Sequence, residues 1–301
     1  MRPTSILLLT APLTLFACSG GDAAKGGGGK ADENETGTPD TGGSTETEAC
    51  GYTSAEDLDP SDDVVEVELS AAALAWDPGT GVPLTDGLAF NGMVPGPIFE
   101  ATVGQTLRVH FTNDTDSDLT LHWHGLRVPI QMDGVPEISQ PEVPTGGSFT
   151  YDFIVPDAGT FWYHPHVMSA AQVGFGLYGA LVVEDPAERV GVNDALTLVL
   201  SDIATEDNGT LESPDSGGTA GMVFGREGNH VLVNGREVPR LVARAGALQR
   251  WRVVNAAKSR FFELSLDDHH LDVIGVDGGL IEAPVTQETV VLGPGERADI
   301  I

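Results

Sequence analysis

The sequence predicts an all-β protein with two tandem β-sandwich or barrel domains. The composition supports this class, since the 301 residues include 38 glycines and 19 prolines and contain few long helical patterns. Short β-branched and alternating runs then recur between turn residues, and part of the motif order occurs twice. Because domains usually hold about 100–150 residues, two domains are expected.

The runs begin at Val64 and follow one another at the spacing of a β-sandwich or barrel. Strands without intervening helical patterns argue against an alternating β/α fold. One short helix is expected, at residues 168–173. Representative strand segments are residues 107–111, 148–155, 180–183 and 196–200.

An internal repeat divides this β region in two. The pair Asn91-Gly92 returns as Asn234-Gly235, each followed by a proline, and Asn113 corresponds to Asn255. Gly104, Leu107 and Arg108 likewise match Gly246, Leu248 and Arg250. Two similarly built domains are the simplest explanation. We expect the first domain to cover residues 63–186 and the second residues 187–301.

The N-terminus predicts export. Arg2 precedes an apolar run at residues 6–16 that is too short to cross a bilayer, which needs about 20 residues. Residues 1–18 therefore form a signal peptide. Its end, Leu15-Phe16-Ala17-Cys18, resembles a bacterial lipobox, so we expect a periplasmic or cell-surface protein with a lipid anchor at Cys18. Cleavage after another small residue is the alternative.

Residues 19–62 have the composition of a flexible acidic linker, since they contain mainly Gly, Thr, Glu and Asp. Cys50 lies in this segment and has no partner once Cys18 is lipidated. The chain has only two cysteines, which excludes a disulfide-stapled scaffold and a four-thiolate metal site. A formal net charge of −30 excludes a nucleic-acid partner.

Two His-x-His motifs predict a metal site. His122 and His124 end one predicted strand, and His164 and His166 end another. Residues i and i+2 of a strand share a face, so each pair can contribute two imidazoles. Imidazole ligands suit copper or zinc, and copper binds more tightly. Affinity is expected to fall below about pH 6.5, where free imidazole is protonated.

The other four histidines do not have this pattern. His110 and His230 are isolated in sequence, and the adjacent His269 and His270 would face opposite sides of a strand. We expect structural or surface roles for all four. The second domain then has no metal motif.

The motifs together resemble the first two cupredoxin domains of a three-domain multicopper oxidase. The resemblance implies tandem cupredoxin-like Greek-key domains, of which the second is C-terminally incomplete. Supporting motifs in the second domain include residues 232–235, 277–278 and 294–297. Those of the first domain are His122-Trp123-His124-Gly125, Met132-Asp133-Gly134-Val135-Pro136, the segment from Gly159 to His166, and Gly176-Leu177-Tyr178-Gly179-Ala180.

Roles follow from this resemblance. His122 corresponds to a ligand of the type 2 copper, His124 and His164 to ligands of one type 3 copper, and His166 to a ligand of the other. The missing third domain would supply the remaining ligands. Asp133 matches an acid that relays protons to oxygen in some members, although a turn-forming role before a glycine explains it equally well.

The type 1 copper of the family requires a cysteine between two histidines, and neither cysteine here has such neighbours. The first hypothesis is an N-terminal part of an oxidase. It would take electrons from phenols, aromatic amines or metal ions and reduce dioxygen to water, and this part alone would be inactive. The alternative is an exported copper-binding or structural protein. A His-x-x-His-x-His motif after Ile301 would favour the first.

Overall fold

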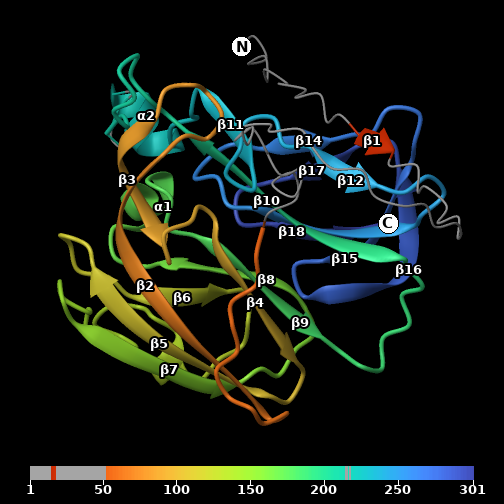
Figure 1. Ribbon diagram of the computed structural model, residues 1–301, viewed down its shortest axis with the longest axis horizontal. Helices are drawn as coiled ribbons and strands as arrows, with labels where there is room; N and C mark the ends of the chain where they lie inside the picture. The colour runs from red at the N-terminus through yellow and green to blue at the C-terminus, as the bar shows by residue number, and fades with distance from the viewer. Residues whose placement is uncertain (1–14, 18–51, 214–215, 217) are drawn as a thin grey trace, which may run out of the picture.

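The computed structural model describes residues 15–17, 52–213, 216 and 218–301 (Figure 1). Within them the fold is almost entirely β, which confirms the predicted class. The proposed lipidation site Cys18 and Cys50 lie outside the described residues, as do most of the signal peptide and linker. Strand β1 (Leu15–Ala17) pairs in parallel with β12 (Leu241–Ala243).

The first domain consists of two four-stranded sheets with strand orders β3-β2-β5-β7 and β4-β9-β8-β6. The first sheet contains β2 (Val64–Trp76), β3 (Leu84–Phe90), β5 (Thr106–Asp114) and β7 (Ser148–Ile154). The second contains β4 (Gly96–Thr102), β6 (Leu121–His124), β8 (Gly159–Pro165) and β9 (Gly179–Glu184).

Side chains from the facing sides of these two sheets form one core. In β5, buried and partly exposed residues alternate along the strand, as expected when one face of a strand meets the core. Leu107, Val109 and Phe111 thus pack against Trp123 and Tyr163 of the second sheet, and all five are fully buried.

Residues 52–62, which the composition placed in the linker, are ordered against the first domain. The Tyr52 hydroxyl oxygen accepts a hydrogen bond from the backbone N–H of Ala180 at 2.7 Å. The backbone N–H of Ala55 donates to Ile98 O at 2.8 Å, and that of Leu58 to Glu66 O at 2.8 Å. A few apolar side chains and backbone hydrogen bonds to existing strands are sufficient to order a short polar segment.

The second domain is built on a six-stranded sheet of order β11-β10-β13-β18-β15-β16, with the pair β14–β17 packed beside it (Figure 1). Strand β9 ends at Glu184 and β10 begins at Asp194. The elements are β10 (Asp194–Ile203), β11 (His230–Val233), β13 (Gln249–Asn255), β14 (Phe262–Leu264), β15 (Leu271–Val276), β16 (Gly279–Gln287), β17 (Val290–Leu292) and β18 (Arg297–Ile300).

The repeated asparagines make matching contacts in the two domains. Asn91 Oδ1 accepts from Ser70 N at 2.7 Å, and Asn234 Oδ1 accepts from Val199 N at 2.7 Å. Both asparagines have a φ of 49°, in the left-handed region that asparagine tolerates better than most residues. Each motif therefore fastens a turn to a neighbouring strand.

Helices are few and short. Helix α1 (Ser169–Gly174) lies where the sequence predicted one, and a 3₁₀ turn, η2, spans Ile130–Met132. Helix α2 (Gly218–Phe224) was not predicted, since it is short and contains two glycines. No helix in the described part of the chain is long and apolar enough to span a bilayer.

The domains share a buried apolar contact. Trp162 and Val182 of the first domain pack in one cluster with Val199, Val254 and Ala256 of the second. Because Trp162 lies between Phe161 and Tyr163 on β8, the strand that carries His164 is fixed from both domains.

Candidate metal centre

Two neighbouring strands bring the histidine motifs together. Strands β6 and β8 are antiparallel, and His122 lies directly opposite His164, whereas His124 lies opposite Trp162. In β6 the neighbours Leu121 and Trp123 point into the core. Side-chain alternation therefore places His122 and His124 on the other face.

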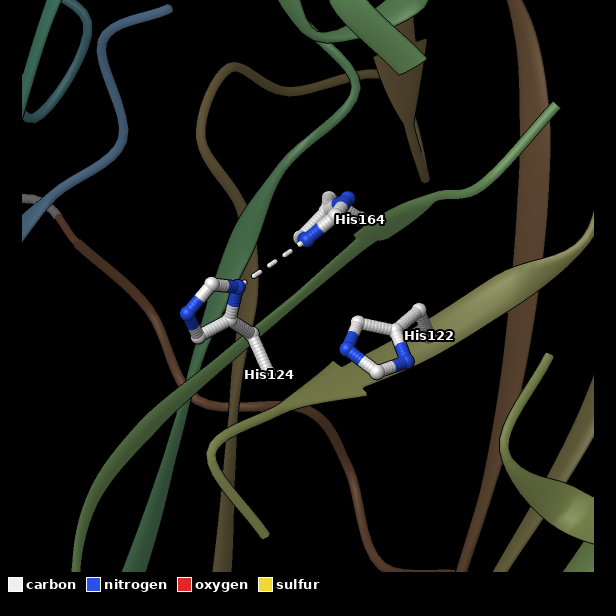
Figure 2. Close-up of side chains that lie close together, drawn as sticks. All are labelled: His122, His124 and His164. Carbon is white, nitrogen blue, oxygen red and sulfur yellow. Dashed lines mark hydrogen bonds between the residues drawn. The ribbon is translucent and has the colours of Figure 1, made fainter. Parts of the chain in front are cut away.

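Three of the four predicted ligands converge (Figure 2). The ring centroids of His122, His124 and His164 are 5.4–5.9 Å apart, and one nitrogen from each lies within 4.8 Å of the other two. His166 follows the end of β8 and is exposed, with its ring centroid 5.2 Å from that of His122. His166 borders this group without belonging to it.

Each of the three rings has one nitrogen available to a metal. The Nδ1 atoms of His122 and His164 donate to the backbone carbonyls of Asp133 and Pro165, both at 2.8 Å. Because a carbonyl only accepts, Nδ1 carries the proton and Nε2 keeps its lone pair. His124 instead presents Nδ1, which lies 3.4 Å from Nε2 of His164 (Figure 2). This all-imidazole donor set fits copper.

Burial keeps two of the ligands neutral. It lowers the pKa of His124 to about 4, with the positive charge of Arg297 adding to the effect, and it lowers the pKa of His164 to about 3. Protonation would place a charge in a poorly solvated site. The sequence predicted weaker metal binding below about pH 6.5. Because the pKa values of His124 and His164 are lower than that of free imidazole, protons should compete with the metal for these two ligands only at lower pH.

Asp133 contacts His122 through both its backbone carbonyl and its side chain. It ends the η2 turn, and its backbone carbonyl orients His122 as described above. Its Oδ1 atom lies 3.3 Å from Nδ1 of His122, and its side chain is 34% exposed. The carboxylate therefore lies beside the Nδ1 edge of the His122 ring, away from the free Nε2, and is partly exposed to solvent.

Aromatic side chains hold the histidine rings. The buried Trp162 ring has its centroid 4.8 Å from that of His124 and 4.3 Å from that of His164, with interplanar angles of 29° and 33°. On the core side, Trp123 Nε1 donates to Met132 O at 2.9 Å.

Sequence reasoning missed the second domain's contribution. Gly295 and Arg297 pack against His124 and Gly125, and a methyl group on Gly295 would lie 3.2 Å from Nε2 of His124. The motif at residues 294–297 was noted only as part of the resemblance. Its proximity to the histidines depends on how the domains pack, which has no signal in the sequence.

The other histidines lie outside the three-ligand group in the described residues. His110 pairs with Glu66 at 2.6 Å, and His230 pairs with Glu237 at 2.6 Å. His269 makes a 2.8 Å contact with the carbonyl of Asp267 in its own turn. These are local structural contacts.

Comparisons with known proteins agree with this site. Two family models, both described as multicopper oxidase, match residues 76–188 and 194–301. Multicopper oxidase MmcO of Mycobacterium tuberculosis is 31% identical over 249 residues, which are 73% of this chain and 48% of the relative. Laccase-2 of Cryptococcus neoformans var. grubii is 32% identical over 238 residues, covering 71% of this chain and 40% of the relative.

Solved structures show the same fold. A multi-copper oxidase from Pseudomonas thermotolerans superimposes with a TM-score of 0.74 and 36% identity over 79% of this chain and 57% of that one. A metallo-oxidase from Campylobacter jejuni superimposes with a TM-score of 0.75 and 27% sequence identity, over 83% of this chain and 52% of that one. The chain thus spans less than half of the two curated relatives named above. It belongs to the multicopper oxidase family, whose members use copper centres.

Proposed function

We propose that this chain is the copper-binding N-terminal part of an exported multicopper oxidase. The whole protein would couple one-electron oxidation of a phenol, an aromatic amine or a metal ion to the four-electron reduction of dioxygen to water. The observation that carries the proposal is the convergence of three imidazole nitrogens, one each from His122, His124 and His164, within 4.8 Å of one another.

The residues of this chain would have distinct roles. His122, His124, His164 and His166 would hold copper of the type 2 and type 3 centres, together with ligands from a third domain. Bound copper supplies one-electron redox chemistry and a place for dioxygen to be reduced. Asp133 would pass protons from solvent at its carboxylate, which is 34% exposed and lies beside His122.

Trp162 provides a direct test of copper binding. Its ring packs on two of the ligands, so bound cupric ion should quench its fluorescence. We expect His122→Ala and His124→Ala to reduce the copper bound at pH 7 sharply, and Trp162→Phe to reduce the quenching. The double variant His269→Ala/His270→Ala is the control, since both residues are exposed and belong to the second domain. Equal stoichiometry in all variants would contradict the site.

Oxidase activity requires a separate measurement. The copper-loaded 301-residue chain should show no intense blue thiolate absorption and should not oxidise phenols. The product of the complete reading frame should consume dioxygen with a phenol, an aromatic amine or a reduced metal ion as the electron donor. A copper-loaded product that consumes none with any of these donors would leave the exported copper-binding protein as the better explanation.

Export and lipid attachment belong to the same proposal. Arg2 and the apolar run at residues 6–16 support export, and the sequence ending at Cys18 supports a lipid anchor in a bacterial periplasm or on the cell surface. Cys18→Ser should release the protein from the membrane fraction if the anchor is present. Unchanged fractionation would favour cleavage at another residue.

A further inference from the structure

The histidine closest to the second domain is His124. Its Nδ1 points to His164, so Nε2 faces outward, toward Gly295. Whereas backbone carbonyls fix His122 and His164, no hydrogen bond from Nε2 of His124 is formed among the described residues. Packing holds this ring: Trp162 covers its face and the loop at residues 293–297 covers its edge.

That loop is anchored by Arg297, which is 5% exposed. Its Nε donates to Thr160 O at 3.0 Å, its Nη1 to Gly295 O at 2.9 Å and its Nη2 to Asp277 O at 2.5 Å. The first of these bonds joins the loop to β8, and the second fixes the residue that touches His124. A single guanidinium thus links the second domain to the metal site.

The guanidinium also lies close to the site backbone. A methyl group on Gly125, the residue after His124, would lie 2.1 Å from Nη2 of Arg297, so only glycine leaves room for this approach. Gly125 has a φ of +88°, which glycine adopts without strain. A permanent positive charge beside a cation site would oppose metal binding.

Asp277 offsets this charge. Its Oδ1 atom lies 2.9 Å from Nη1 of Arg297 and also accepts from the backbone N–H of Arg297 at 2.9 Å. The guanidinium and the carboxylate together carry no net charge, and 52% of the carboxylate side chain remains exposed. The positive charge of Arg297 lowers the pKa of His124 and Asp277 acts against it, so Asp277 reduces the positive charge next to His124 while the pair anchors the loop.

We propose that Arg297 and Asp277 form a positioning pair for the metal site, in which Arg297 holds the loop against His124 and Asp277 partly offsets its charge, which favours binding of a divalent cation. This inference rests on the proposed copper site. Neither residue touches the metal position. Outer partners of this kind orient ligands and tune affinity in many metal sites.

The key variant is Asp277→Asn, which keeps an oxygen that can accept from Arg297 N but removes the negative charge. We expect cupric affinity, measured by quenching of Trp162 fluorescence, to fall about tenfold. The loss for cuprous ion should be smaller, because repulsion by Arg297 scales with the charge of the bound ion. The reduction potential of bound copper should rise accordingly. Asp194→Asn is the matched control, since Asp194 pairs with Arg244 at 2.9 Å in the same domain.

The double variant Asp277→Asn/Arg297→Gln separates charge from structure. If charge compensation matters, removing both charges should return the ratio of cupric to cuprous affinity toward the wild-type value, even where loss of the Arg297 anchor lowers both affinities, whereas a purely structural role leaves this ratio unchanged in both variants. Circular dichroism establishes whether each variant is folded. If the double variant does not fold, the ratio of cupric to cuprous affinity in Asp277→Asn decides the question.

The outcomes separate this inference from the proposed function. Wild-type protein that binds no copper at its histidines would refute the function and the inference together. Wild-type protein that binds copper, with an Asp277→Asn variant of equal cupric affinity and an unchanged affinity ratio, would refute the positioning pair alone. A folded double variant that keeps the altered ratio of cupric to cuprous affinity of the single variant would do the same.

Discussion

Thr160 of the first domain donates a 2.5 Å hydrogen bond from Oγ1 to Oδ1 of Asp299 in the second. The other carboxylate oxygen, Oδ2, accepts from Arg250 Nε at 3.0 Å and Arg252 Nη1 at 3.3 Å, and all four residues are buried. Since Thr160 lies on β8 with His164, this network connects the domain interface to the strand that carries a metal ligand.

Replacing Asp299 should destabilise the protein strongly. Asp299→Asn leaves two buried guanidinium groups without their shared carboxylate, and losing one partner of a buried ion pair costs about 3–5 kcal/mol. The free energy of unfolding in urea measures this. Asp194→Asn is the control, because Arg244 is exposed and such surface pairs contribute about 0–1 kcal/mol. Similar losses in both variants would show that the buried network does not hold the domains together.

Gly134 should tolerate no side chain. It has a φ of +73°, and a methyl group there would lie 1.7 Å from the carbonyl oxygen of Leu121, the residue before His122. Gly134→Ala should therefore lower the free energy of unfolding by more than about 3 kcal/mol and reduce copper binding. Gly104→Ala separates the two causes, because Gly104 has a φ of +93° but open space around it. Backbone strain alone should cost about 1–2 kcal/mol, and equal losses would exclude the clash.

The repeated asparagines Asn113 and Asn255 should contribute similar stability. Both are fully buried, and each Nδ2 donates to two backbone carbonyls while Oδ1 accepts from a backbone N–H. Substitution by alanine should cost about 2–4 kcal/mol in either domain, because it leaves buried carbonyls unpaired. Asn208→Ala, at an exposed turn, should cost less than about 1 kcal/mol by the same urea measurement. A large cost in only one domain would contradict equivalent roles.

The metal-free protein should lose stability in acid partly through its ligands. The native pKa values of His124 and His164, about 4 and about 3, lie below the unfolded value of 6.5. The unfolded state therefore binds more protons below pH 6.5, and stability falls with pH until each native pKa is passed. Urea unfolding between pH 7 and pH 4 should show a smaller decrease in the variant His124→Gln/His164→Gln than in the wild type. Parallel pH profiles would show that these histidines are not buried in neutral form.

Periodicity explains what was predictable about the site. In a strand, residues two apart share a face, so His122 and His124 were expected to point the same way, and in the structure they do. His166 lies just after β8, which ends at Pro165, and its ring centroid is 5.2 Å from that of His122 and 6.3 Å from that of His164. The predicted linker included residues 52–62, which pack on the first domain. Composition shows that a segment has too little apolar surface to fold alone, but it does not show whether a neighbouring strand supplies hydrogen-bond partners.

The sequence by itself determined the all-β class, the two repeated asparagine motifs and the histidines that serve as candidate ligands, because these depend on local backbone preferences and on side-chain alternation. Only the tertiary structure decided that His122 lies opposite His164, that Trp162 packs on both His124 and His164, and that Arg297 and Asp277 lie behind His124. Such contacts join residues far apart in the chain. They depend on strand register and domain packing, which the whole buried core sets and no short motif encodes.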